Sequence, residues 1–278
     1  MLITKGSGES VPFNAQKLKS SLKKAGANEL IADVILQEIE DELYEGIPTK
    51  KIYKLAFNKL KENSSSFAAR YHLKQAIMDL GPSGYPFEKF IAEIWIQLGF
   101  KVQTGKILKG KCINHEIDVL AENHHKVITI ECKFHNQHGS MSDVKVPLYV
   151  HSRFLDIWAV MKQNPHFQHK KIEGWIITNT RFTKDAAQYG TCVGLHLLGW
   201  DFPENQGIKD LIDDLGLYPL TCLTTLSKSE KQMLLDKQIV LCKEIFYRPV
   251  LLQDLNMHEN RTSKVLQEVE LLCRELKK

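Results

Sequence analysis

Two stretches of the 278-residue sequence decide the fold of its middle part: HEIDVL at residues 115–120 and VITIECK at residues 127–133. Both are rich in β-branched and apolar residues, which is typical of strands, and the short polar turn between them predicts an antiparallel pair. Because side chains alternate along a strand, Glu131 and Lys133 lie on one face and Cys132 lies on the other. Charged residues in such a strand are costly unless they meet partners.

Asp118 lies in the first of these strands, and the turn is expected to bring it beside Glu131. Two carboxylates at one spot repel each other, and hard oxygen ligands suit Mg²⁺ or Mn²⁺ rather than zinc. We therefore expect Asp118 and Glu131 to be metal ligands, with Lys133 adding positive charge where a metal-activated water attacks a phosphate. The spacing alone leaves open an ordinary salt bridge on a surface hairpin.

Helices and strands alternate around this pair. The expected elements are a helix that ends at Gly99, β-like runs at 100–104, 116–121 and 126–134, a helix over 146–161, a strand over 175–178, a helix over 183–189 and an apolar run over 195–200. Their order is α-β-β-β-α-β-α-β. This order predicts an α/β core whose sheet is covered by helices on its faces.

The same region carries a family resemblance on the motifs Phe87-Glu88, Leu98-Gly99-Phe100, Glu116-Ile117-Asp118, Glu131-Cys132-Lys133 and ITNTRFT at 177–183. On these motifs it resembles the PD-(D/E)xK nuclease superfamily and, within it, the Mrr-like restriction endonucleases. The resemblance implies a Mg²⁺-dependent endodeoxyribonuclease in which Asp118 and Glu131 bind the metal, Lys133 is the catalytic lysine and Glu88 is an accessory acid. Many Mrr-like members have glutamine-alanine before the lysine, so this sequence is nearer the E-x-K form shared with junction resolvases.

The N-terminal segment is expected to begin with a short extended stretch, followed by helices over 15–25, 28–43, 49–60 and 67–80. The motifs ITKGSGE at 3–9, VPFN at 11–14, Lys17-Leu18 and Ala69-Arg70-Tyr71 resemble those of the ATP-cone family. The resemblance implies that ATP or dATP binds as a regulatory ligand, with Lys5 and Lys17 near the phosphates. Gly6 stands where the family commonly has a second basic residue. The sequence holds no G-x-x-x-x-G-K-[ST] loop, so we expect the nucleotide not to be consumed.

The GPSG stretch at residues 81–84 is the best linker candidate. The expected domains are an ATP-cone over 1–80, an endonuclease domain over 84–203 and a helical C-terminal extension over 207–278, with helices at 228–235 and 261–276. Lys106, Lys109 and Lys111 are interleaved with glycines, which favours a loop that contacts phosphates.

Composition is that of a globular protein, with 43% hydrophobic and 25% charged residues. The net charge of +4 permits nucleic-acid binding without requiring it. The sequence has no apolar run of the roughly 20 residues that a membrane span needs, and no signal-peptide core, so we expect a cytoplasmic protein with no membrane partner. A homo-oligomer is compatible with the sequence.

The sequence therefore predicts an α/β protein in which a small, mostly helical ATP-cone precedes a restriction-endonuclease-like core and a helical extension. Its predicted function is metal-dependent DNA cleavage regulated by ATP or dATP, in restriction or defence, with DNA repair as a near alternative. A nucleotide-responsive DNA-binding regulator on an inactive nuclease scaffold is the rival from another class. Retention of Asp118, Glu131 and Lys133 together favours the enzyme.

Overall fold

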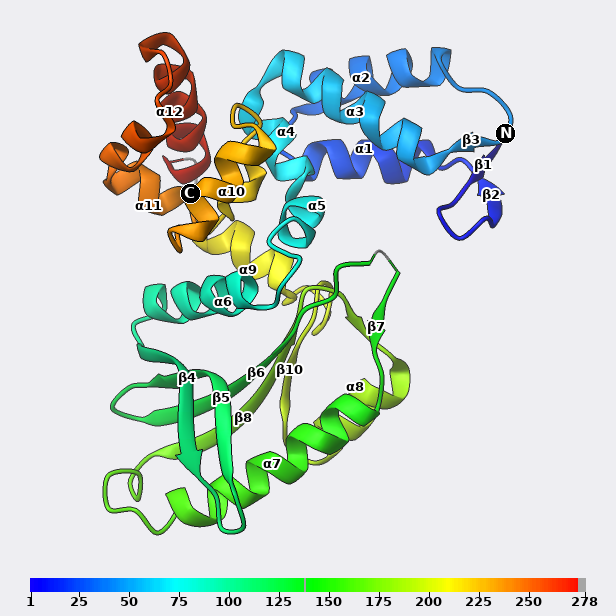
Figure 1. Ribbon diagram of the computed structural model, residues 1–278. Helices are drawn as coiled ribbons and strands as arrows, with labels where there is room; N and C mark the ends of the chain where they lie inside the picture. The colour runs from blue at the N-terminus through cyan, green and yellow to red at the C-terminus, as the bar shows by residue number, and fades with distance from the viewer. Residues whose placement is uncertain (138, 275–278) are drawn as a thin grey trace. The chain divides into compact units, whose positions relative to one another are not determined.

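The computed structural model describes residues 1–137 and 139–274, which form two compact units (Figure 1). The first unit contains Met1–Lys74, Cys222–Lys231 and the described residues from Cys242 onward, and the second contains Gln75–Thr221 and Gln232–Leu241. The division into domains at 1–80, 84–203 and 207–278 stays a prediction, because compactness does not establish which segment folds alone. In the described part of the chain, no helix is long and apolar enough to span a membrane.

The N-terminal part of the first unit combines a small sheet with helices. Strands β1 (Leu2–Thr4), β2 (Ser10–Pro12) and β3 (Ile47–Pro48) form a sheet in the order β2-β1-β3, and helices α1 (Ala15–Lys24), α2 (Glu29–Asp41), α3 (Thr49–Asn63) and α4 (Ser65–Tyr71) follow the chain. Asn14 begins α1 by accepting a hydrogen bond from the Lys17 N–H at 2.8 Å. Asn28 does the same for α2. Gly26, with φ 107°, follows the end of α1, as expected.

The expected single helix over 67–80 is wrong, because the structure divides it at His72 into α4 and α5 (Leu73–Met78). The His72 N–H still bonds to the Ala68 carbonyl and closes α4. Its ring Nδ1 lies 2.7 Å from the Tyr53 hydroxyl of α3. The contact with Tyr53 of α3 thus lies where α4 ends and α5 begins.

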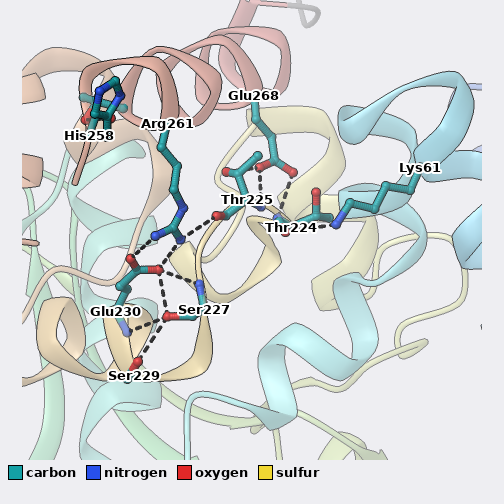
Figure 2. A network of polar contacts seen from close by, with 10 residues as sticks. Lys61, Thr224, Thr225, Ser227, Ser229, Glu230, His258, Arg261 and Glu268 are labelled. Atoms are coloured by element: carbon teal, nitrogen blue, oxygen red, sulfur yellow. Dashed lines mark hydrogen bonds and ion pairs between the residues drawn. The ribbon is translucent and has the colours of Figure 1, made fainter.

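The C-terminal part of the first unit consists of α11 (Cys242–Tyr247), the 3₁₀ helix η2 (Pro249–Leu255) and α12 (Glu259–Arg274), and α10 (Lys228–Asp236) begins in it. The last residues of the helix expected over 261–276 lie outside the described residues. Figure 2 shows how this part is held. The fully buried Glu268 accepts hydrogen bonds from the N–H groups of Thr224 and Thr225, and Lys61 of α3 donates to the Thr224 carbonyl. The 222–227 loop therefore contacts both α12 and α3, and α3 lies about 160 residues before the loop in the sequence.

The second unit contains a five-stranded sheet in the order β10-β8-β6-β5-β4. Its elements are α6 (Tyr85–Gln97), β4 (Lys101–Lys109), β5 (Asn114–Glu122), β6 (Lys126–Lys133), α7 (Lys145–Met161), β8 (Lys171–Thr178), α8 (Lys184–Cys192), β10 (His196–Leu198) and α9 (Ile208–Leu215), with short strands β7 (Met141–Ser142) and β9 (Arg181–Phe182) paired separately. The strands β4, β5 and β6 are antiparallel, whereas β6, β8 and β10 are parallel. The expected order of the main elements is thus observed, in a mixed sheet.

Helices α6 and α7 cover opposite faces of this sheet (Figure 1). Trp175 of β8 packs edge-on against Trp95 of α6, with ring centroids 5.5 Å apart. The next residue, Ile176, belongs to a buried cluster with Val150 of α7. Adjacent residues of a strand point to opposite faces, so each helix has its own face.

The expected lysine loop is wrong for two of its three residues, because Lys106 and Lys109 lie within β4 and only Lys111 lies in the following turn. Gly105 adopts a φ of 60° inside the strand, and pairing continues beyond it with Lys106 opposite Ile117. A glycine that was expected to loosen the chain instead sits within a continuous edge strand.

Candidate functional site

The site begins where strands β5 and β6 separate. Their registered pairs run from Glu122 and Val127 to Val119 and Ile130 and stop there. At the next position the Asp118 carboxylate, rather than a backbone carbonyl, accepts the Cys132 N–H at 2.7 Å. The pairing of β5 with β4 also skips Asp118. The end of the β5–β6 ladder thus places the Asp118 carboxylate against the backbone of Cys132.

Glu131, near the end of β6, carries a cation on each carboxylate oxygen. The Lys133 ammonium donates to Oε1 at 2.7 Å, and the Arg153 guanidinium of α7 donates through Nη1 to Oε2 at 2.7 Å. Arg153 also donates through Nη2 to the Glu116 carbonyl. The Glu131 side chain is only 10% exposed. The two charged residues predicted on this strand, Glu131 and Lys133, are therefore paired with each other, and Glu131 is also paired with Arg153 of α7.

Asp118 and Glu88 hold their protons unusually tightly. Burial, reinforced by the charge of Glu131, raises the pKa of Asp118 to about 6. Burial also raises the pKa of Glu88, in the first turn of α6, to about 7, with the charges of Asp118, Glu131 and Glu116 adding to the effect. The charges of Asp118 and Glu131 act on Glu88, and that of Glu131 acts on Asp118, so these carboxyl groups lie within electrostatic reach of one another. The structure therefore brings Glu88, Asp118, Glu131 and Lys133 into one neighbourhood, as the sequence predicts, while their chemical roles stay predictions.

The carboxylate oxygens at this site are ligands of the type that a hard divalent cation prefers, but few residues supply them. Among residues 1–137 and 139–274, no three His, Cys, Asp or Glu side chains are grouped so that they could hold a metal ion. Asp118 and Glu131 offer carboxylate oxygens, the ligands that Mg²⁺ accepts, and Mg²⁺ keeps several waters when protein ligands are scarce. The raised pKa of Asp118 indicates a carboxylate that a nearby cation would stabilise. The two carboxylates thus match such an ion by donor chemistry, and its remaining ligands would have to be water or substrate.

The two predicted nucleotide-binding lysines lie on the surface of the first unit. Lys5 directly follows β1, and its ammonium pairs with Glu9 at 2.9 Å across a turn in which Gly8 has a φ of 84°. Lys17 lies in the first turn of α1, and its side chain is exposed. No contact joins the two lysine side chains in the described structure. Any shared ligand would therefore have to bridge them.

Sequence reasoning missed Arg153 and Asp156 of α7. Arg153 lies three residues after the buried Val150 and four before the buried Ile157, which places it on the inner stripe of the helix. An arginine on such a stripe is a signal that the sequence could have provided. Asp156 accepts hydrogen bonds from the Cys112 N–H and from His115, both at 2.8 Å. It ties the turn between β4 and β5 to α7.

Comparisons with known proteins give a family but no activity. Residues 1–77 match the model of the ATP cone domain, and residues 218–273 match the model described as AF1548-like, C-terminal. An uncharacterized protein of Archaeoglobus fulgidus is 36% identical over 155 residues, which make up 56% of this chain and 83% of that protein.

A crystal structure described as that of a protein of unknown function, AF1548, matches with a TM-score of 0.54 and 31% identity over 68% of this chain and 98% of that chain. The predicted ATP cone is thereby confirmed, and the match supports nucleotide binding as its function. None of these relatives supports the resemblance to Mrr-like nucleases. The chain belongs to the AF1548-like family and carries an ATP cone domain at residues 1–77.

Proposed function

We propose that this protein is a metal-dependent DNA endonuclease whose activity responds to nucleotide binding at the ATP cone. One observation carries the proposal: three acidic side chains and a lysine gather where the β5–β6 ladder opens at Asp118. Clustered ionisable groups with perturbed pKa values are a mark of functional sites. The α-β-β-β-α-β order of this unit is the order of the nuclease core that the sequence resembles.

Each residue of the cluster has a role in this proposal. Asp118 and Glu131 would hold Mg²⁺ or Mn²⁺, which when bound lowers the pKa of a water and neutralises charge on the scissile phosphate. Lys133, whose side chain is 33% exposed, can turn from Glu131 toward a phosphate oxygen and stabilise its negative charge. Glu88, whose pKa is about 7, is present in both protonation states near neutral pH and can supply a proton to the leaving oxygen.

The DNA-contacting surface in this proposal is the β4–β5 hairpin. Lys106 and Lys109 lie on the edge strand β4 and Lys111 lies in the turn, close in sequence to Asp118. Lysines contribute affinity for phosphates without reading the base sequence. A role in restriction, defence or DNA repair comes only from the resemblance to Mrr-like enzymes and stays a prediction.

Nicking of supercoiled plasmid by the parent protein tests the proposal. We expect conversion to open circles with Mg²⁺ or Mn²⁺ and none with EDTA. Asp118→Asn removes a ligand charge and should raise the Mg²⁺ concentration needed for half-maximal activity by about tenfold or more. The absence of metal-dependent nicking would refute the proposal. An unchanged Mg²⁺ requirement in Asp118→Asn would remove Asp118 from the metal site.

Nucleotide binding is tested by calorimetry with ATP and dATP. We expect heat of binding in the parent, a large loss of affinity in the Lys5→Ala/Lys17→Ala double variant, and no steady release of phosphate. Lys162→Ala/Lys184→Ala, which removes the same charge from the second unit, is the matched control. Equal binding by the parent and the Lys5/Lys17 variant would show that other residues hold the phosphates.

One observation favours the rival, a nucleotide-responsive DNA-binding protein without nuclease activity. Both oxygens of Glu131 are already occupied by cationic side chains, as they would be in a purely structural ion-pair network. This rival predicts nucleotide-dependent binding of DNA in a gel-shift assay, together with no nicking at any metal concentration.

A further inference from the structure

Arg153 is held by three different groups at once. Its Nη1 donates to Glu131 Oε2 at 2.7 Å, its Nη2 donates to the Glu116 carbonyl, and its guanidinium lies over the Tyr149 ring at 5.3 Å from the centroid. The side chain is 15% exposed. The planar guanidinium fork makes both hydrogen bonds in a fixed geometry, so the position of Oε2 is fixed with it.

Lys133, the other partner of Glu131, is held much more loosely. Among the described residues, its ammonium pairs with Glu131 alone, from Nζ to Oε1 at 2.7 Å, and its side chain is 33% exposed. A lysine is a point charge on a flexible stem that can move without disturbing its neighbours. The two oxygens of Glu131 therefore differ, because Oε2 is fixed and Oε1 can be released.

The helix that carries Arg153 is itself fixed against β5. One turn further along α7, Asp156 accepts hydrogen bonds from Cys112, Ile113 and His115 in the segment that leads into β5. These hydrogen bonds fix the position of α7 relative to β5, the strand that bears Asp118. Arg153 thus links the carboxylate of Glu131 to β5, the strand that also carries Asp118.

We infer that Arg153 is a positioning residue: it fixes Oε2 of Glu131, so that Oε1 is the oxygen that would be left for a divalent cation if Lys133 turns away. This role rests on the proposed function, because it assigns Glu131 to a metal. It makes a prediction opposite to that of simple electrostatics. Removing a nearby positive charge should strengthen cation binding, whereas removing a positioning group should weaken it.

The test is Mn²⁺ binding without DNA, measured by the loss of the free-ion electron paramagnetic resonance signal. We expect Arg153→Gln to bind Mn²⁺ about tenfold more weakly than the parent, and Arg153→Lys to recover part of the affinity. Arg248→Gln is the matched control, because Arg248 is an exposed arginine that pairs with Glu244 at 3.3 Å. It should bind Mn²⁺ like the parent.

A double-mutant cycle separates positioning from loss of folding. If Arg153 acts through Glu131, then Arg153→Gln should have no further effect on Mn²⁺ binding in a Glu131→Gln background, whereas a folding defect would add to the first loss. Equal or tighter binding by Arg153→Gln, additive effects in the cycle, or no Mn²⁺ binding by the parent would overturn the inference. Plasmid nicking by the parent reports separately on the proposed function, since it can succeed when the Arg153 cycle fails.

Discussion

Replacing Glu268 with glutamine tests whether the C-terminal segment is an integral part of the first unit. The carboxylate of Glu268 is fully buried, and its two oxygens accept three hydrogen bonds from the 222–227 loop (Figure 2). Oε1 accepts the Thr224 N–H at 2.8 Å, and Oε2 accepts the Thr225 N–H at 3.0 Å and the Thr225 hydroxyl at 2.6 Å. Glutamine keeps the shape of the side chain but has only one acceptor oxygen.

The structure sets the size of the effect. In its better orientation the glutamine oxygen faces Thr225, and its amide NH₂ then points at the Thr224 N–H, which is left without an acceptor. An unsatisfied, largely buried donor costs about 1–3 kcal/mol, and the loss of charge-assisted bonds adds to this. We expect Glu268→Gln to lower the free energy of unfolding by about 2 kcal/mol.

Two measurements check this expectation. Urea denaturation followed by far-ultraviolet circular dichroism gives the free energy, and hydrogen exchange gives the protection of the 222–227 amides. Glu259→Gln, an exposed residue in the first turn of the same helix, is the matched control and should change stability by less than about 1 kcal/mol. Stability within about 0.5 kcal/mol of the parent, with the loop amides equally protected, would refute the reasoning.

Two further predictions concern the turn before β5 and the acid stability of the first unit. Gly110→Ala should destabilise the second unit by about 1–3 kcal/mol, because a β-carbon there would lie 2.0 Å from Asp156 Oδ2 and 2.5 Å from the Ile113 carbonyl. Thermal unfolding checks this against Gly6→Ala, whose added β-carbon would have no atom within 4 Å other than those of its chain neighbours. Hydrogen bonds from Arg261, and then from Ser227, lower the pKa of Glu230 from 4.5 to about 2. The ion pair therefore stabilises the fold above pH 4.5 and loses that effect as the pH falls through about 2. Arg261 is 45% exposed, so solvent screening weakens its ion pair with Glu230. Arg261→Gln should still flatten the pH dependence of the urea midpoint in this range, and an unchanged profile would contradict the prediction.

Sequence patterns predicted the local elements well, because the physical signals for them are local. Asn14 and Asn28 begin α1 and α2 as capping residues do, and Gly99, with φ 86°, follows α6 as the glycine after a helix commonly does. The strand that carries Glu131 and Lys133 was predicted from its β-branched residues. The placement of Glu88 near Asp118 was implied by the family resemblance rather than by any local signal.

The features that the sequence did not predict depend on contacts between distant residues. Strand β4 continues to Lys109 only because β5 pairs with it, since its exposed lysines carry no strand periodicity of their own. The pairing of Arg153 with Glu131 depends on how α7 crosses the sheet. The contact between Lys61 and Thr224 joins residues 163 positions apart. No spacing rule reaches that far along a chain.

The central claim is that Lys133 acts in phosphodiester cleavage, and one comparison tests it most directly. The rate of Mg²⁺-dependent plasmid nicking is measured for the parent, for Lys133→Ala and for Lys126→Ala, which removes a lysine at the other end of β6 that pairs with Glu173 at 3.5 Å. We predict that Lys133→Ala loses at least about a hundredfold in rate while it keeps its fold and DNA affinity, and that Lys126→Ala nicks like the parent. A Lys133→Ala variant that nicks within a few-fold of the parent would contradict the account.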